Sequence, residues 1–420
     1  MEAHLFESIN ESEMVKFCRD LVRIESVNPP GEERAIAEYM AAALTSFGLE
    51  AELLGHGPKR ASLLARLRGS ERGPGILFSG HLDTVPVGNG EWKHDPFSGE
   101  IAGGRIWGRG ASDMKGGLAA IIGAAKAVSE SRTPLRGDLI IAATAGEEVD
   151  SLGAETIATR RDIGPLRTIL ISEPSLNEIY VAEKGVLWIE LATHGKTAHG
   201  SMPQLGRNAI TMMVALIEEL EKLKIPFKNH PLLGGFTRSV NTISGGMKTN
   251  VVPDHCVVTI DLRTVPGQNH QEILKQVEES ITKLQKKIVG FRASVKVIND
   301  RLPIETSPEE PVVRKFMEIA RDATGKRPIL KGVSYYTDAS VLVPAFKAPM
   351  IICGPGDPAL AHRPDEYVEI SKLVESAKIY ALAALKLLQN PDSASHPDAN
   401  AEDSGGRSAN EGRPLDNRIP

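Results

Sequence analysis

Short apolar segments that run directly into histidine or acidic residues recur along this chain of 420 residues. A segment that is apolar at every position packs on both faces, as an inner strand of a parallel sheet does. The carboxyl ends of such strands meet at one edge, where ligands bind in open α/β sheets. We therefore expect an α/β fold with a mostly parallel sheet whose edge gathers the side chains that follow these segments, namely His81 with Asp83, Asp113, Glu147 with Glu148, Glu173, and His362.

The spacing of His81 and Asp83 is typical of a metal-binding histidine with a carboxylate partner. Side chains at i and i+2 of an extended segment point to the same face. The Asp83 carboxylate can then accept the second ring N–H of His81 while the other ring nitrogen binds an ion. The same pair could instead be a hydrogen-bonded or solvated strand end, and the other polar residues at the sheet edge favour the metal site.

Asp113 ends the loop "GRGASD" and precedes a small-residue helix predicted from about Met114 to Ser129. A carboxylate at this position is commonly an N-cap, and a metal ligand is the alternative. The loop also matches part of the G-x-G-x-x-G pattern of dinucleotide sites. Its sixth position is Asp113, whose charge would repel a pyrophosphate, so we set a dinucleotide site aside.

Length and composition limit the class of protein. A chain of 420 residues exceeds the usual size of one hydrophobic core, so two domains are expected. Hydrophobic residues make up 41% and charged residues 25%, which is ordinary for a soluble globular protein. The net charge of −5 provides no positive field for a phosphate backbone, so we expect no nucleic-acid partner.

The cysteines and the N-terminal residues indicate a cytoplasmic protein. Only three cysteines occur, Cys18, Cys256 and Cys353, and none forms a C-x-x-C pair. The first residues, "MEAHLFESINESEMVKF", lack the basic and apolar regions of a signal peptide. No uninterrupted apolar stretch reaches the ~18 residues that a membrane helix needs. We therefore expect a reducing compartment and no membrane contact.

The order of predicted elements divides the chain into two domains and a tail. Between residues 185 and 298, a strand, a helix, two strands, a helix and a strand give the β-α-β-β-α-β order of a ferredoxin-like domain. We expect this domain to be inserted into a catalytic, metal-binding domain formed by residues 1–184 and 299–390. Residues 391–420 are polar and rich in Pro, Gly and Ser, so we expect them to be disordered.

The side chains expected at the sheet edge suit a site for two metal ions. Imidazole and carboxylate ligands together favour Zn²⁺, with Co²⁺ or Mn²⁺ as substitutes. His81, Asp113, Glu148, Glu173 and His362 are the candidate ligands. Glu147 remains outside this set, and a free carboxylate beside an activated water can act as a general base.

Nearly the whole chain to about residue 390 resembles the zinc aminoacylase/carboxypeptidase family of acetylornithine deacetylase, succinyl-diaminopimelate desuccinylase and carboxypeptidase G. The motifs that carry the resemblance are "SGHLDTVP", "GRGASDMKGG", "AGEEVDSLGA", "SEP", "HGKTAHGSMPQLGRNAI", "GGMKTNVVPD", "DLRTVPG" and "AHRPDEYV". The resemblance implies a hydrolase that acts on amides, with an inserted lid that forms a homodimer. It also implies the ligand pairing, with His81 and Glu173 on one ion, Glu148 and His362 on the other, and Asp113 bridging.

The resemblance extends to residues outside the metal site. It implies that His199 reaches the active site of the neighbouring subunit and that Asn250 and Arg263 hold carbonyl or carboxylate groups of the substrate. Without the family match, His199 would be an ordinary loop histidine and Arg263 a surface arginine on a strand. The glycines of "CGPGD", Gly354 and Gly356, could bring backbone N–H groups close to a carboxylate.

We expect the substrate to be a small N-acyl-amino acid that is cleaved by deacetylase-type or desuccinylase-type deacylation. Where a diaminopimelate desuccinylase is expected to carry an arginine pair, this chain has Glu183-Lys184-Gly185, which argues against a diamino-diacid. A carboxypeptidase or dipeptidase is the alternative within hydrolases. A non-catalytic, metal-stabilised binding protein is the alternative from another class, and the presence of Glu147 argues against it.

Overall fold

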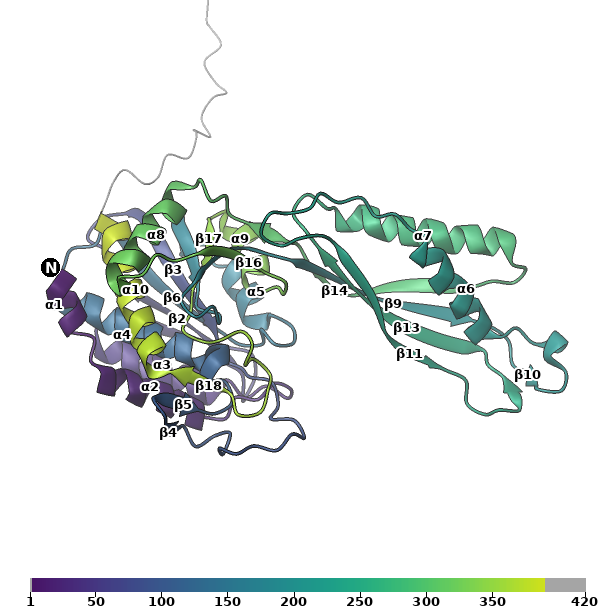
Figure 1. Cartoon of the computed structure of the whole chain (residues 1–420), viewed down its shortest axis with the longest axis horizontal. Helices are drawn as coiled ribbons and strands as arrows, with labels where there is room; N and C mark the ends of the chain where they lie inside the picture. Colours follow the sequence, from purple (N-terminus) through teal and green to yellow (C-terminus); the bar gives the residue numbers. More distant parts are fainter. Residues whose placement is uncertain (1, 390–420) are drawn as a thin grey trace, which may run out of the picture.

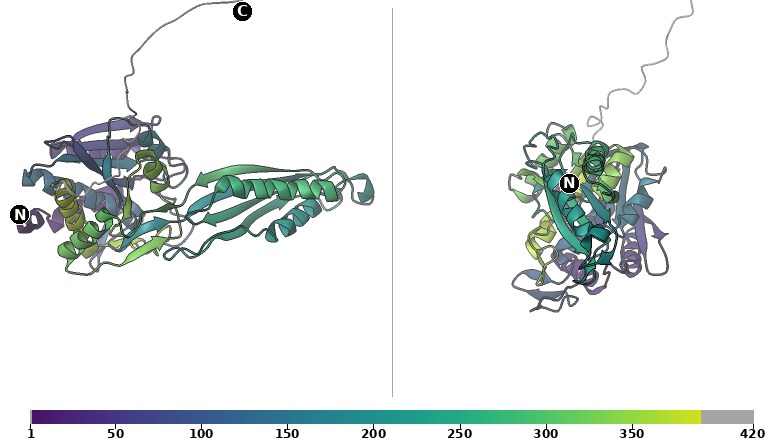
Figure 2. Two further views of the ribbon diagram at one scale, coloured as in Figure 1. Left: turned by 90° about the horizontal axis from the view of Figure 1, so that it is seen from above. Right: turned by 90° about the vertical axis from the view of Figure 1, so that its right-hand side faces the viewer.

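The computed structural model describes residues 2–389 and consists of a compact part and an elongated arm (Figure 1). The compact part is built on a nine-stranded sheet and the arm on a four-stranded one. The arm comes from the middle of the chain, so the segments at both of its ends enter the compact part (Figure 2). The tail that we expected to be disordered, residues 391–420, lies outside the described residues.

The inner strands of the large sheet are parallel. Strand β3 pairs in parallel with β6 and with β7, and β7 pairs in parallel with β17. Strands β1, β2 and β15 pair antiparallel toward the edges, so the prediction of an α/β fold with a mostly parallel sheet is confirmed. The spatial order is β1 (Glu50–Gly55), β2 (Ala61–Leu67), β6 (Gly137–Thr144), β3 (Gly73–His81), β7 (Leu166–Ile171), β17 (Met350–Ile352), β8 (Ile179–Glu183) and β15 (Ile304–Glu305), with β16 (Leu330–Val333) also paired to β8.

Both faces of this sheet are buried, which explains why its inner strands are apolar at every position. Ile76 and Phe78 of β3 pack into the core on one face, and Leu77 packs into the core on the other. The first face is covered by α1 (Glu2–Glu7), α2 (Glu11–Arg23), α3 (Arg34–Ser46), α4 (Gly116–Ser131), α8 (Pro311–Thr324) and α10 (Ile370–Gln389). The second face is covered by α5 (Leu152–Ala158) and α9 (Ala339–Phe346).

Helix α4 lies unusually close to the sheet because its sequence is rich in glycine and alanine. A Cβ atom at Gly117 would lie 2.4 Å from the backbone oxygen of Ser172, which is less than any van der Waals contact. Ser172 immediately precedes Glu173 at the end of β7. The small residues of α4 therefore fix where this acidic side chain leaves the sheet.

A small three-stranded sheet joins two loops that are far apart in the sequence. It consists of β4 (Glu100–Ala102), β5 (Arg105–Trp107) and β18 (Tyr367–Glu369). Tyr367 pairs with Trp107 across β18 and β5. The loop that carries His362 therefore lies beside the loop that carries Asp113.

The arm has the β-α-β-β-α-β order that the sequence predicts. Its antiparallel sheet has the spatial order β11 (Thr237–Gly245), β13 (His255–Thr264), β9 (Gly185–His194) and β14 (Ala293–Arg301). Helices α6 (Ala209–Glu221) and α7 (His270–Lys287) pack on one face of it. Strand β14 continues to Arg301, beyond the boundary expected at residue 298. A short ladder of β10 (Ala198–His199) and β12 (Val251–Val252) lies at the far end of the arm (Figure 1).

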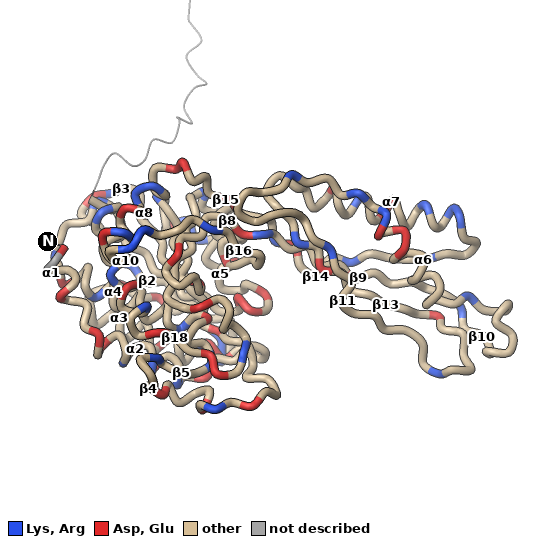
Figure 3. The backbone as a smooth tube through the Cα atoms, viewed as in Figure 1, with Lys and Arg blue, Asp and Glu red and all other residues tan. Residues whose placement is uncertain are grey.

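Positive and negative residues are interspersed over both parts of the chain (Figure 3). Helix α7 has the most visible row of lysines, and it also carries acidic residues in its sequence "HQEILKQVEESITKLQKK". No helix within residues 2–389 has the length and apolar character that crossing a membrane requires.

The arm and the compact part are tied together by hydrogen bonds where β14 leaves the arm. The guanidinium of Arg301 donates to the backbone oxygen of Asp150 at 3.0 Å and to the carboxylate of Glu155 at 3.1 Å. Asp150 lies in the loop that follows β6, close in sequence to Glu147 and Glu148. The last strand of the arm thus contacts the loop that supplies two of the predicted site residues.

The close packing of α4 predicts the outcome of a glycine substitution. Alanine normally stabilises a helix relative to glycine, but Gly117→Ala places its methyl group against a backbone oxygen that has no room to move. We expect a loss of about 2 kcal/mol in the free energy of unfolding, typical of an overpacked core, measured by chemical denaturation. Gly123→Ala is the matched control in the same helix, since its added methyl group meets the flexible end of Met14. Equal stability of the two variants would contradict this explanation.

Candidate metal centre

The predicted metal ligands lie together at the carboxyl edge of the large sheet. His81 ends β3, Glu148 follows β6, Glu173 follows β7, His362 lies in the loop after β17, and Asp113 lies just before α4. Possible ligand atoms of His81, Glu147 and Glu173 all lie within 4.8 Å of one another, and so do those of His81, Asp113 and Glu148. The chain therefore brings these five side chains into one cluster, and His362 joins it through contacts with Asp113 and Glu148.

Asp113 occupies the middle of this cluster. One of its carboxylate oxygens lies 3.1 Å from Nε2 of His81, and the other lies 3.4 Å from Nε2 of His362. His362 also lies 3.1 Å from Glu148, and His81 lies 3.6 Å from Glu173. A carboxylate whose two oxygens face two different histidines has the geometry that a bridge between two ions requires.

The alternative of Asp113 as an N-cap does not agree with the structure. Helix α4 begins at Gly116, and its N-cap position is Lys115. Asp113 has non-helical φ and ψ angles and lies in a short irregular segment before the helix. Its carboxylate points to histidines instead of the free N–H groups of the first turn.

Glu366 and Arg109 hold the Asp113 loop in place. The Glu366 carboxylate accepts hydrogen bonds at 2.9 Å from the backbone N–H groups of both Ser112 and Asp113. Arg109 forms an ion pair with Glu366 at 2.5 Å, and both side chains are buried. Sequence analysis did not identify this pair, although Glu366 lies in "AHRPDEYV" and Arg109 in "GRGASD".

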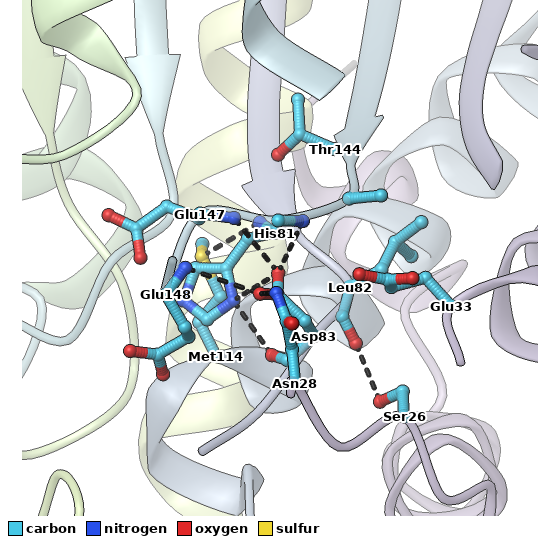
Figure 4. Close-up of polar contacts among 12 residues, drawn as sticks. Ser26, Asn28, Glu33, His81, Leu82, Asp83, Met114, Thr144, Glu147 and Glu148 are labelled. Atoms are coloured by element: carbon cyan, nitrogen blue, oxygen red, sulfur yellow. Dashed lines mark hydrogen bonds and ion pairs between the residues drawn. The ribbon is translucent and has the colours of Figure 1, made fainter. Parts of the chain in front are cut away.

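Asp83 has a different role from the one expected for its carboxylate. The Nδ1 atom of His81 lies 2.9 Å from the backbone oxygen of Asp83 and 3.7 Å from its nearest carboxylate oxygen. The carboxylate instead accepts hydrogen bonds from the backbone N–H groups of Gly146, Glu147 and Glu148 (Figure 4), at 3.1 to 3.2 Å. The Asp83 carboxylate thus binds three backbone N–H groups, and the ring nitrogen Nδ1 of His81 contacts the backbone oxygen of Asp83 instead.

Asn28 completes the support around Asp83. Its side-chain amide donates to the Asp83 carboxylate at 2.9 Å (Figure 4). The carboxylate has no exposed surface, so the hydrogen bonds from Asn28 and from three backbone N–H groups replace those of water. Asp83 therefore fixes the shape of the loop that presents Glu147 and Glu148, and it orients His81 through its main chain.

Burial and neighbouring charges both shift the pKa values of the cluster. Burial, with repulsion from other carboxylates, raises the pKa of Glu147 and Glu173 well above the usual range. Burial opposes the charged form of His81, but carboxylates such as Glu173 and Asp113 raise its pKa well above normal. Hydrogen bonds to two carboxylates raise the pKa of His362 to about 10. The cluster thus attracts positive charge strongly.

The composition of the cluster fits divalent cations. It contains four carboxylates, those of Asp113, Glu147, Glu148 and Glu173, and two histidines, so with all four acids ionised it would be negative even when both imidazoles are protonated. Buried charges of one sign are costly unless they are paired or coordinate a metal. Imidazole and carboxylate donors are the usual ligands of Zn²⁺, Mn²⁺ and related ions.

A cavity of about 350 Å³ opens beside the cluster, between the compact part and the arm. The compact part contributes the acidic residues, His362, Tyr335 and Tyr336, and the arm contributes Trp188 of β9 and Arg263 of β13. The Arg263 guanidinium is held by Asp261 at 2.9 Å. Arg263 is therefore the one predicted substrate-binding residue that lies at the same cavity as the metal cluster.

His199 and Asn250 lie elsewhere. They lie at the β10–β12 ladder at the far end of the arm (Figure 1), where the N–H of Gly200 donates to the backbone oxygen of Asn250 at 2.8 Å. Within one chain they do not meet the metal cluster. Neither residue therefore lines the cavity beside the metal cluster of its own chain.

Gly354 and Gly356 serve close packing behind the cluster. A Cβ atom at Gly354 would lie 2.2 Å from the backbone oxygen of Ser172, and one at Gly356 would lie 2.2 Å from that of Ser112. The N–H of Gly354 donates to the Ser175 hydroxyl at 2.9 Å. This N–H is therefore used within the protein, contrary to its expected role toward a substrate carboxylate.

Comparison with known proteins identifies a family and several relatives of this chain. Residues 77–386 match the model of peptidase family M20/M25/M40. An acetylornithine deacetylase of Photorhabdus laumondii is 31% identical over 87% of this chain and 94% of its own length. A Staphylococcus epidermidis protein named probable succinyl-diaminopimelate desuccinylase is 25% identical over 89% of this chain and 97% of its own length.

A solved structure shares the fold. A Bacillus subtilis protein, described as a dinuclear metal binding peptidase from the M20 family, superposes with a TM-score of 0.68, at 17% identity, over 90% of this chain and 98% of its own. The family match spans the arm, every residue of the metal cluster and the strands of the central sheet that follow β3 in the sequence. This chain belongs to peptidase family M20/M25/M40.

Proposed function

We propose that this hydrolase cleaves the amide bond of a small N-acyl-amino acid by a water molecule activated at a dinuclear metal site. The observation that carries the proposal is the position of Asp113, whose two carboxylate oxygens face His81 and His362. The description of the Bacillus subtilis protein as a dinuclear metal binding peptidase supports it. The names of the two relatives, a deacetylase and a desuccinylase, support an acyl-amino acid as the substrate.

The ligands divide into two sets that share Asp113. His81 and Glu173 would hold one ion, and Glu148 and His362 would hold the other. Bound Zn²⁺, or Co²⁺ or Mn²⁺ in its place, supplies Lewis acidity to water and to the amide carbonyl. The Asp83 carboxylate keeps the Glu147–Glu148 loop in the shape that this arrangement requires.

Glu147 is proposed as the general base. Its carboxylate lines the cavity and, among residues 2–389, has no hydrogen-bond partner. In this role it takes a proton from the attacking water and passes it to the leaving amine, so the two proton transfers need only one group. Arg263, which also lines the cavity, would hold the substrate carboxylate and place the amide between Arg263 and Glu147.

A homodimer joined through the arm is proposed to supply His199. The Nδ1 atom of His199 lies 2.7 Å from the Ser201 hydroxyl and 3.2 Å from the Ser201 backbone nitrogen, so its contacts within residues 2–389 use Nδ1 and leave Nε2 for a substrate. Exposed apolar residues near this end of the arm, Ile243 and Met247, support a surface that another subunit covers. The three cysteines, all free and buried, support a cytoplasmic enzyme.

Peptide hydrolysis is the alternative, since the family is one of peptidases. A dipeptide also presents an amide and a terminal carboxylate, which Arg263 could bind in the same way. Purified protein loaded with Zn²⁺ or Co²⁺ should hydrolyse N-acetyl- and N-succinyl-amino acids faster than dipeptides at equal concentration. The reverse order of kcat/KM would replace the deacylase with a peptidase.

Substitution of Glu147 distinguishes a role as general base from a role as metal ligand. Glu147→Gln should keep close to two metal ions per chain by elemental analysis and lose turnover by about 10²- to 10⁴-fold, the usual contribution of general-base assistance. Glu91→Gln, in an exposed loop, is the control and should keep both metal content and turnover. Loss of one metal ion in Glu147→Gln would instead make Glu147 a ligand.

Mixed dimers test the proposed role of His199. His199→Ala should lower kcat by about 10²- to 10³-fold, as removal of one oxyanion donor typically does, with little change in KM. Neither His199→Ala nor Glu147→Gln homodimers should be active, but subunit exchange creates one site in which both groups are intact. Activity should therefore reappear on mixing. Heterodimers seen by native mass spectrometry without recovered activity would show that His199 does not act across the interface.

A further inference from the structure

Three aromatic side chains line the cavity beside the metal cluster. Aromatic residues make up 5% of the chain, yet Trp188, Tyr335 and Tyr336 are three of the twelve residues that line this cavity. Pro174, Pro358 and Ala361 add further apolar surface. The part of the cavity outside the metal cluster is therefore mainly apolar and aromatic.

These rings are held in fixed positions by the protein. Trp188 and Tyr336 pack edge to face, with centroids 6.4 Å apart and planes at 78°. The Tyr336 hydroxyl accepts a hydrogen bond from the Asn299 amide at 3.1 Å, and the Tyr335 hydroxyl donates to the backbone oxygen of Pro174 at 3.4 Å. With the two hydroxyls engaged, the rings offer their hydrocarbon surfaces to a ligand.

The charged residues around the aromatic rings suit a substrate that carries one carboxylate and no additional ammonium group. Apart from the metal cluster, Arg263 is the only charged residue among the described residues 2–389 that lines the cavity. Asp261 occupies its Nε and Nη2 atoms, whereas Nη1 has no hydrogen bond to residues 2–389. The ammonium group of Lys184 lies close enough to Arg263 that, after burial, the arginine contributes to lowering the lysine's pKa. Outside the metal cluster, a second ammonium group on a substrate would thus meet the positive charge of Arg263 and no carboxylate among the lining residues.

We infer that the cavity selects an N-acyl-amino acid whose side chain is a neutral aromatic ring, and that Trp188 and Tyr336 are the residues that determine this specificity. The inference rests on the proposed function and makes it more specific. A planar ring fills the space between the aromatic side chains and gains stacking or edge-to-face contacts with them. The ornithine and diaminopimelate groups in the names of the relatives each carry an extra ammonium, for which the cavity lining outside the metal cluster provides no acidic partner.

Hydrolysis of a matched set of substrates tests the inference. The Zn²⁺-loaded enzyme is assayed with the N-acetyl derivatives of phenylalanine, tryptophan, alanine and ornithine, and with N-succinyl-diaminopimelate. We expect kcat/KM for N-acetyl-phenylalanine to exceed those for N-acetyl-alanine and N-acetyl-ornithine by about tenfold or more, as a well-filled apolar pocket provides. A preference for N-acetyl-ornithine or N-succinyl-diaminopimelate would overturn the inference and leave the proposed function intact. Hydrolysis of none of the amides by protein with two bound ions would overturn the proposed function itself.

Paired substitutions test whether Trp188 and Tyr336 determine the preference for an aromatic substrate. Trp188→Leu and Tyr336→Leu should each reduce the ratio of kcat/KM for N-acetyl-phenylalanine over N-acetyl-alanine toward one. Trp188→Phe and Tyr336→Phe keep an aromatic surface and should keep the preference, which separates a specificity role from a loss of folding.

Binding without turnover gives an independent measurement. Calorimetric titration of metal-loaded Glu147→Gln protein with the same amides should show tighter binding of N-acetyl-phenylalanine than of N-acetyl-alanine. Adding Trp188→Leu to this variant should remove the difference. An unchanged difference in the double variant would show that Trp188 does not recognise the ring.

Discussion

Repulsion among four carboxylates at one edge of a sheet is the constraint on which the site depends. Asp113, Glu147, Glu148 and Glu173 come from three separate loops, and when all four are ionised two histidines cannot balance their charge. Such a group of acids remains stable in the folded chain when positive ions join it. The same excess of negative charge gives the site its affinity for divalent metals, so stability and function depend on one interaction.

Two buried carboxylates that are not themselves part of the cluster hold it in position. Asp83 binds the backbone of the Glu147–Glu148 loop, and Glu366 binds the backbone before and at Asp113. Each uses its charge to accept N–H groups that the loops cannot satisfy within a strand or helix. Loops that carry ligands are thereby fixed as firmly as the strands that they follow.

The sequence predicts the sheet and its polar edge well because apolar strands and their order leave few alternatives. Thus the convergence of His81, Glu173 and His362 follows from strand ends alone. Details of hydrogen bonding within loops do not follow, since they depend on backbone angles that no spacing reveals. For this reason the partner of the Asp83 carboxylate was assigned wrongly, and Glu366 was not noticed. The positions of His199 and Asn250 relative to a site remain a prediction, because they depend on a second chain.

The arm is joined to the compact part by the chain before β9 and by the chain after β14, and these two strands are neighbours in one sheet. Two adjacent connections define a single bending axis. The cavity takes Trp188 and Arg263 from one side of this axis and all its other lining residues from the opposite side. The width of the cavity therefore depends on how these two strands are held relative to the compact part. Arg301 anchors β14 to the loop after β6 at this junction. The hydrogen bonds of Arg301 therefore link the placement of Trp188 and Arg263 to the same loop that presents Glu147 and Glu148.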